Sequence, residues 1–312
     1  MRRISIIAVC MTALLASIQP AGAQSSPYRA FSSDSYWNTK LGSRAPVDPN
    51  NASMMSWLIS HASPGYVTLA GAATDGSYGQ PIYWAKSGDP VYAVSGSGLP
   101  PEFAHLRIPR GAKPDSSGDS ELTVFDEVSG YVSWLAGAHF DGTNWSATGG
   151  SVTYLASNGL DGTLSQSNEP RNRGHRGFPA AEIAVRYDEV AAGGYLHVVK
   201  MSIPNTCNHV FPMSGDEGCS GGSPFPEGTR IRIKRTIDLS HLGLSPAALV
   251  VAKALRQYGA VVGDQSGGSV VVKVENTVAE GRGNLWLGVM TRDSLSNIPL
   301  QDFEVIKLGY GG

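Results

Sequence analysis

The chain has 312 residues, and its 24 Lys and Arg and 26 Asp and Glu are scattered along it without a basic stripe. A formal net charge of -2 in this arrangement disfavours nucleic acids and anionic surfaces as partners. The 38 Gly and 19 Pro predict many turns and few helices, and the length suits one large β-rich domain.

The first 23 residues have the layout of a cleavable secretory signal. Two arginines precede an apolar stretch from Ile4 to Ile18, and Ala-Gly-Ala stands before Gln24. The stretch is shorter than the roughly 20 apolar residues of a membrane span, and no later segment approaches that length. We therefore expect residues 1–23 to be removed, residues 24–312 to form a single domain, and the protein to be secreted, into the periplasm or out of the cell.

Short runs rich in Val, Ile, Tyr and Trp dominate the chain after an extended arm at 27–50 and a short helix expected near 51–61. Gly, Pro and Ser separate these runs, which is typical of strands in a sandwich or barrel. The predicted strands are 78–85, 90–94, 121–127, 131–137, 151–157, 182–190, 195–203, 229–237, 269–276, 285–290 and 303–308. We expect an all-β fold of the β-sandwich or jelly-roll type.

One long helix is expected near 246–258. Ser245 and Pro246 supply a cap and a first-turn residue, apolar residues follow at helical spacing up to Leu255, and Gly259 ends the pattern.

Cys207 and Cys219 are the cysteines left after removal of the signal. An even pair in an exported protein predicts a disulfide, which here closes a Gly-rich loop.

The stretch VRYDEVAAGGYLHVVK, residues 185–200, predicts a β-hairpin with a small-residue turn in its middle. In the favoured register Asp188 faces His197, and Arg186 lies on the same face. A carboxylate opposite a His orients the ring, as a general base requires. A shift of one residue pairs Glu189 with His197 instead, so both pairings stay open.

Two interpretations of this hairpin stay open, an active site and a structural ion pair. Polar residues continue along its second strand and beyond it, at Lys200, Asn205, Asn208 and His209. Several titratable groups would then converge in one cleft. Cross-strand ion pairs are common, however, and a buried charge needs a partner whether or not it has a function.

Two other histidines are candidates for substrate binding. His139 lies between aromatic residues and could line a sugar-binding cleft or occupy a turn. His175 lies in a basic loop in which Arg171, Arg173 and Arg176 could hold a carboxylate or sulfate group of a substrate, or could be solvated.

Several other functions are disfavoured. The motif GDQSGGS, at 263–269, is close to the GDSGG loop of chymotrypsin-like proteases, but Gln265 would displace Ser266 from the oxyanion-hole turn. No G-x-S-x-G elbow is present in a strand-to-helix setting. HExxH, paired CxxC and calcium-loop patterns are also absent from the sequence, so we expect neither a metal nor a cofactor.

Several segments together resemble a broad group of secreted bacterial β-rich proteins, and the resemblance implies no particular activity. The segments are YWNTKLGSRAPVDPN, YGQPIY, AEIAVRYDEVAAGGYLHVVKMSIPNT, GTRIRIKRTIDLS, ALRQYGAVVGDQSG and DFEVIKL. The resemblance implies a shared fold and hairpin, with the shared positions occupied by Asp188, Glu189, His197, Tyr258, Gly259 and Asp264. The chain departs from the group's Asp-x-His at Asp119-Ser120-Glu121, and it has Lys200 where the group has Arg.

These features lead us to expect a secreted carbohydrate-active enzyme, a polysaccharide lyase or a glycosidase, that acts on an extracellular polysaccharide. Export, abundant Trp and Tyr, and an acid-base cluster are compatible with it. The alternative is a non-catalytic exported module that binds a polysaccharide or a cell-surface partner. We expect a monomer whose partner is a polysaccharide or oligosaccharide.

The two reactions require different residues. In a glycosidase, Asp188 and Glu189 would be the acid and base, but neighbouring strand residues point to opposite faces, so Glu121 or Asp264 would complete the pair. In a lyase, a base would take the proton beside a uronate carboxylate, and a neighbouring polar group would neutralise that carboxylate. The candidate bases are His197 and Tyr187, and the candidate neutralising groups are Lys200, Arg186 and Asn205; His209 and His139 are further candidate contacts of the substrate.

Overall fold

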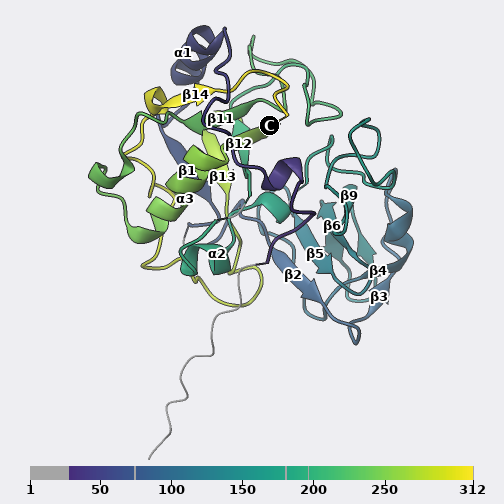
Figure 1. Cartoon of the computed structure of the whole chain (residues 1–312). Coiled ribbons are helices and arrows are strands. Elements are labelled where there is room, and N and C mark those ends of the chain that lie inside the picture. The colour runs from purple at the N-terminus through teal and green to yellow at the C-terminus, as the bar shows by residue number, and fades with distance from the viewer. Residues whose placement is uncertain (1–27, 74, 180, 196, 312) are drawn as a thin grey trace, which may run out of the picture.

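The computed structural model describes residues 28–311 apart from 74, 180 and 196. The predicted signal sequence, residues 1–23, lies outside the described residues. Strands predominate over helices in the described part, which confirms a β-rich fold. Figure 1 shows the chain arranged in a larger and a smaller lobe, each with a sheet of its own.

The larger lobe contains a six-stranded mixed sheet with the order β1-β13-β10-β12-β11-β14. Its strands are β1 (Val67–Ala70), β10 (Val199–Ile203), β11 (Arg230–Ile233), β12 (Ala260–Gln265), β13 (Val270–Lys273) and β14 (Phe303–Val305). All residues of β10 and β11 are buried. Strands that are covered on both faces usually consist of apolar residues. Burial of a charged side chain in such a strand therefore costs free energy.

Both predicted helices are present, as α1 (Asn51–His61) and α3 (Pro246–Gln257). The Ser245 hydroxyl accepts a hydrogen bond from the Ala248 N–H at 3.2 Å, which caps α3. A third, short helix is α2 (Tyr187–Ala191). The 3-10 helices are η1 (Tyr36–Asn38), η2 (Pro101–His105), η3 (Ala181–Ile183), η4 (Leu239–His241) and η5 (Leu300–Asp302). None of the helices in the described part of the chain has the length and apolar content needed to cross a membrane.

The smaller lobe contains a four-stranded sheet with the order β2-β5-β6-β9 and two short strand pairs, β3 with β4 and β7 with β8. The sheet consists of β2 (Ile82–Ala85), β5 (Leu122–Asp126), β6 (Tyr131–Ala136) and β9 (Gly149–Tyr154), and the pairs of β3 (Val91–Tyr92), β4 (Leu106–Arg107), β7 (His139–Phe140) and β8 (Trp145–Ser146). All residues of β5 are buried.

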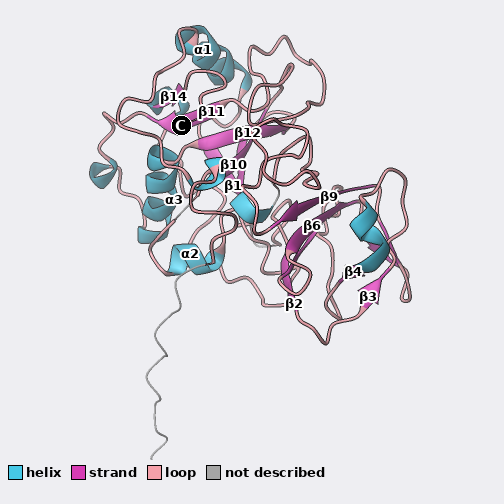
Figure 2. Ribbon diagram, turned by 45° about the vertical axis from the view of Figure 1, so that its right-hand side comes forward, coloured by secondary structure: helices cyan, strands magenta, loops and turns pink. Residues whose placement is uncertain are grey.

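The predicted sandwich is not confirmed. The larger apolar clusters follow the individual sheets, and Figure 2 shows the two sheets in different lobes. A sandwich instead has its core between two stacked sheets. Three strand pairs are also parallel, β1 with β13, β10 with β12 and β2 with β5, whereas a jelly roll is built from antiparallel strands.

The two lobes are joined by buried polar contacts. Gln80, just before β2, forms a parallel bridge with Glu275 of the larger lobe. The Ile82 N–H donates to Glu280 Oε1 at 2.8 Å, and Asn276 Nδ2 donates to Asp115 Oδ1 at 3.1 Å. These contacts join β2 and the Asp115 segment of the smaller lobe to residues 275–280, which follow β13 in the larger lobe.

Two predicted strands are wrong, and five strands of the described part were missed, namely β1, β4, β7, β8 and β12. Residues 182–190 contain η3 and α2, and residues 285–290 form turns around the buried Trp286. Among the missed strands, β12 begins directly after the Gly259 that ends the helical pattern, so its apolar residues follow the helix without a separate turn signal.

Candidate functional site

Residues 185–200 do not form the predicted hairpin. The chain leaves the larger sheet after Val185, which bridges Val274, and then turns into α2. The Arg186 N–H donates to the Glu189 carboxylate at 3.4 Å, which closes the first turn of this helix. The alternation of residue types over so few residues did not distinguish a strand from a capped turn.

Glu189, not Asp188, is the carboxylate beside His197. His197 Nε2 and Arg186 Nη2 each lie 3.1 Å from Glu189 Oε1, and His197 Nδ1 lies 2.7 Å from the Val198 carbonyl oxygen. Arg186, Glu189 and His197 are at most 2% exposed. Neighbouring side chains therefore cover this triad, which is the arrangement expected of a structural ion pair.

The other two residues proposed for this site lie at its edge. The Asp188 side chain is 46% exposed and accepts a hydrogen bond from Arg186 Nε at 3.3 Å. The Tyr187 ring packs edge-on against Trp286, with 5.2 Å between the ring centroids. Neither contact directs a base toward a substrate cavity.

A cleft of ≈ 470 Å³ lies where the larger sheet faces the segment before β5. Strands β1, β10, β12 and β13 and the turn after β12 supply most of its lining, and Asp119 comes from the smaller lobe. The lining is rich in hydroxyl and amide groups, and Tyr78 and Arg292 join it from loops of the chain. Its lining residues are Thr68, Leu69, Ala70, Ala73, Ser77, Tyr78, Asp119, Ser202, Asp264, Gln265, Ser266, Ser269, Val271, Lys273 and Arg292.

Two buried lysines lie at this cleft: Lys273 lines it, and Lys200 lies beside Lys273 on the neighbouring strand β10, behind the lining residues. Strands β10 and β13 pair antiparallel with Ser202 opposite Val271, and this register continued by two residues places Lys200 opposite Lys273. Lys200 is 5% exposed and Lys273 is 6% exposed. The sheet thus brings two ammonium groups together where little water can screen their repulsion.

The two lysines have different partners. Lys273 Nζ lies 2.8 Å from Glu121 Oε1 and 3.8 Å from Asp119 Oδ2, both from the smaller lobe. Lys200 has no carboxylate within ion-pair distance among the described residues, and its Nζ lies 5.7 Å from the centroid of the Phe178 ring. Its charge is therefore only partly compensated.

These partners move the pKa values of the two lysines in opposite directions. Burial lowers the pKa of Lys200, and the charge of Lys273 lowers it further against the attraction of Glu121 and Asp264. Burial also opposes the charge of Lys273, but the attraction and hydrogen bond of Glu121 raise its pKa above the usual value. Lys273 is therefore the more firmly protonated of the pair.

A guanidinium holds three carboxyl groups beside the lysines. Arg176 Nη2 lies 2.6 Å from Glu217 Oε1 and 3.2 Å from Asp264 Oδ1, and Arg176 Nε lies 3.1 Å from Glu227 Oε2. Burial and a hydrogen bond to Asp264 raise the pKa of Glu217 to about 8. Burial opposes the charge of Asp264, but its hydrogen bond with Glu217 and the charge of Lys200 lower its pKa to about 2. The Glu217–Asp264 pair therefore holds one proton at neutral pH.

The imidazole of His175 belongs to the same cluster. Burial and the charges of Arg176 and Lys200 together lower its pKa to about 4. The ring contacts Trp134 edge-on, with 4.7 Å between the centroids. His175 is therefore a neutral base at physiological pH.

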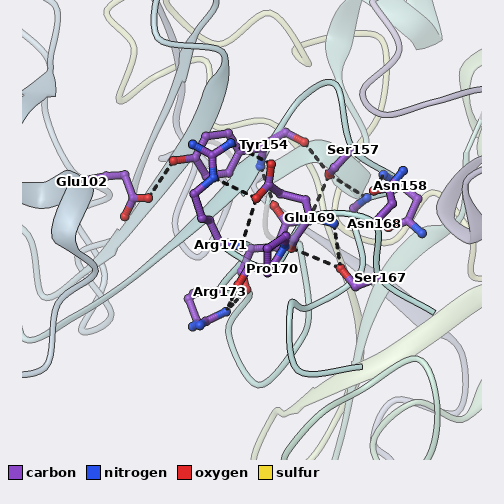
Figure 3. A network of polar contacts seen from close by, with 12 residues as sticks. Glu102, Tyr154, Ser157, Asn158, Ser167, Asn168, Glu169, Pro170, Arg171 and Arg173 are labelled. Carbon is purple, nitrogen blue, oxygen red and sulfur yellow. Dashed lines mark hydrogen bonds and ion pairs between the residues drawn. The ribbon is translucent and has the colours of Figure 1, made fainter. Parts of the chain in front are cut away.

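The other two arginines of the His175 loop, Arg171 and Arg173, form contacts near that loop and away from the cleft. In Figure 3 Arg171 lies against the ring of Tyr154, and its guanidinium carbon is 3.9 Å from the ring centroid. Arg171 Nη2 also lies 2.8 Å from Glu169 Oε2, and the Tyr154 hydroxyl donates to Glu102 at 2.8 Å. Arg173 donates to the Pro170 carbonyl at 2.8 Å. Neither Arg171 nor Arg173 joins the cluster at the cleft.

The predicted disulfide between Cys207 and Cys219 is confirmed. It closes the loop that carries Glu217, and so ties this carboxyl group to the end of β10. His209 lies on the same loop, where Nδ1 is 2.5 Å from Asp216 Oδ2.

The predicted residues thus divide into three groups. Glu121, Lys200 and Asp264 come together beside the cleft, and Asp264 lines it, whereas Tyr187, Asp188, Glu189, Arg186 and His197 lie in or next to α2. Among the described contacts, no hydrogen bond or ion pair joins His139, Asn205 or His209 to Lys200 or Lys273. His139 lies on the exposed β7.

Two central residues of the cluster, Lys273 and Glu217, were not predicted. Arg176 was predicted only as a possible ligand for an anionic group of the substrate, within a basic loop. A signal existed for Lys273, which interrupts the apolar run Val270–Val274. No pattern in the chain indicates that Glu217 would meet Asp264, because a long-range contact brings them together.

Comparisons with protein-family models, curated proteins and solved structures gave no significant match. The described residues also contain no group of three or more His, Cys, Asp or Glu side chains placed to hold a metal ion. The candidate site therefore rests on its own geometry.

Proposed function

We propose that the protein is an exported polysaccharide lyase that acts on a uronate-containing chain bound in the cleft between the lobes. The observation that carries this proposal is the pair Lys200 and Lys273, adjacent on one sheet face and shifted in pKa in opposite directions. Groups whose pKa values are driven apart are suited to separate acid and base roles.

The lining of the cleft supports a carbohydrate substrate. Residues with hydroxyl or amide side chains line it, namely Thr68, Ser77, Ser202, Gln265, Ser266 and Ser269. Such groups exchange hydrogen bonds with sugar hydroxyls. Tyr78 is 52% exposed, and its ring offers an apolar surface for stacking against a sugar ring.

The charges support an anionic substrate. Lys273 would bind the uronate carboxylate, and Arg292 lies further along the lining. An ammonium beside the carboxylate stabilises the negative charge that develops on it when the neighbouring C–H bond is broken.

The reaction would be a β-elimination. Lys200, in its neutral form, takes the proton at C5 of the uronate, and the electron pair of that bond forms the C4–C5 double bond. The bond between C4 and the glycosidic oxygen breaks, and this oxygen takes the proton held by the Glu217–Asp264 pair. The products are an unsaturated uronate and a new chain end, with no other reactant consumed.

We also propose that the protein is exported, and the predicted signal at residues 1–23 and the Cys207–Cys219 disulfide support export. A polysaccharide or oligosaccharide as partner, a monomeric state, a single domain over residues 24–312 and a relation to the secreted bacterial group also remain proposals.

Hydrolysis is the second candidate, because Asp119 and Asp264 reach the same cleft from different lobes. Two carboxyl groups on either side of a glycosidic bond are the usual requirement of a glycosidase.

A screen of the purified mature protein against uronate-containing and neutral polysaccharides tests the proposal. The absorbance of unsaturated uronates and the formation of reducing ends are followed together, with Lys273→Met as the variant. We expect new absorbance that the variant lacks. Formation of reducing ends without new absorbance would show a hydrolase and contradict the lyase proposal. Binding of a polysaccharide without new absorbance or reducing ends would favour the non-catalytic binding module.

A further inference from the structure

We propose a second anion-binding site, for a sulfate or phosphate group, in the basic pocket formed by Lys40, Arg235 and Arg256. This pocket has a volume of ≈ 590 Å³, and its remaining lining residues are Leu41, Ser43 and Gln257. None of these six residues is acidic. The inference goes beyond the proposed function and does not depend on it.

The pocket joins three segments that are distant in the sequence. Lys40 belongs to the N-terminal arm, Arg235 follows β11, and Arg256 lies in the last turn of α3. The Leu41 N–H donates to the Gln257 carbonyl at 2.8 Å, which holds the arm against the end of the helix.

The two guanidinium groups are fixed by backbone oxygens, not by carboxylates. Arg235 Nη2 donates to the carbonyls of Leu41 and Gly42 at 2.8 and 2.9 Å, and Arg256 Nη1 donates to that of Ile237 at 3.0 Å. Each guanidinium has five N–H donors, so these bonds set its position and leave further donors for a ligand.

The positive charge of the pocket is not neutralised by ion pairs among the described residues. Lys40, Arg235 and Arg256 form none there, and Lys40 Nζ lies 5.5 Å from the centroid of the Tyr258 ring. Asp238 lies within electrostatic reach of Arg256, but its carboxylate accepts hydrogen bonds from Ser240 and pairs with His241 at 3.3 Å. Three positive charges that no ion pair among the described residues neutralises favour the binding of an anion.

The geometry favours an anion with several oxygens and more than one charge. A tetrahedral sulfate or phosphate group can accept from cations on three sides, and guanidinium groups bind such oxyanions bidentately. The ion could be free or could be an ester on a polysaccharide.

This pocket is separate from the cleft. Gln257, three residues before β12, lines the basic pocket, and Gln265, the last residue of β12, lines the cleft. A strand of this length spans about 17 Å. The two sites therefore lie toward opposite ends of one strand.

Calorimetric titration of the purified mature protein with sodium sulfate tests the proposal, with sodium chloride at equal ionic strength as the blank. We expect saturable binding that is at least tenfold weaker in Arg235→Gln and in Arg256→Gln. Lys253→Gln is the matched control, because Lys253 is an exposed cation on the same helix that does not line the pocket. Circular dichroism shows whether each variant is folded.

A second titration distinguishes the sources of the anion. Sulfated dextran that binds more tightly per sulfate than the inorganic ion would support an ester as ligand, and equal affinity would support the free ion. Binding that is absent in the unchanged protein, or that persists in both arginine variants, would overturn the site. Because no turnover is measured, failure of the lyase proposal leaves this result unaffected.

Discussion

Lys273 Nζ lies 2.8 Å from Glu121 Oε1, and the two side chains, which come from different lobes, are 8% and 5% exposed. This ion pair thus has a structural and a chemical consequence. It joins the lobes beside the cleft, and it keeps Lys273 protonated next to a second lysine.

Glu121→Gln should destabilise the protein by about 3 kcal/mol, because it leaves the buried Lys273 ammonium without its nearest carboxylate. Urea denaturation monitored by Trp fluorescence would measure the free energy of unfolding. The double variant Glu121→Gln/Lys273→Met is the control, and it should lose less than the sum of the single variants. Additive losses would show that the pair is not coupled.

The burial of His175 should make stability depend on pH. The folded-state pKa of about 4 lies below the ordinary value of 6.5, so between these values the unfolded state binds more protons. Stability should therefore increase from pH 4 to pH 6.5, by about 3 kcal/mol at most. Comparison with His175→Asn by urea denaturation isolates this contribution. Parallel curves for the two proteins across that range would contradict it.

Glu189→Gln should destabilise the fold by about 3 to 5 kcal/mol, because Arg186 and His197 lose the carboxylate they share in a buried site. Activity per folded molecule should be unchanged at a temperature where the variant remains folded. Asp188→Asn is the matched control, since that exposed side chain should contribute less than about 1 kcal/mol. A large loss of activity in a folded Glu189→Gln protein would indicate that the active site lies at α2.

The Glu217–Asp264 pair should limit activity at alkaline pH. Above the Glu217 pKa of about 8 the shared proton is lost, and with it the proton for the leaving oxygen. The rate should therefore decline above pH 8, and Glu217→Gln should have a low rate at every pH without that decline. A rate that continues to rise through pH 9 would argue against this pair as the proton source.

The fold was predictable where local signals agree. Ser245 and Pro246 mark the start of α3, and the apolar alternation in β5 and β6 marks two strands. The error at residues 182–190 has a local cause, since the carboxylate of Glu189 caps a turn that alternation alone presents as a strand.

The site was predictable only in part. Lys200 was identified as a polar residue in an apolar strand, and Glu121 and Asp264 as carboxylates that could complete an acid-base pair. Their grouping depends on contacts between β5, β10, β12 and β13, and the parallel pairing of β10 with β12 follows from no turn in the chain. Lys273 and Glu217 could not be assigned to the cluster without that topology.

The most direct test of the central claim is the rate of unsaturated-uronate formation by Lys200→Arg, on a substrate found with the unchanged protein. Arginine keeps the positive charge but does not release its proton near neutral pH, so it cannot replace a lysine base. The account predicts a loss of at least a hundredfold in kcat with substrate binding retained, and no change in Lys253→Arg. A Lys200→Arg protein that is folded and retains its kcat would contradict the account.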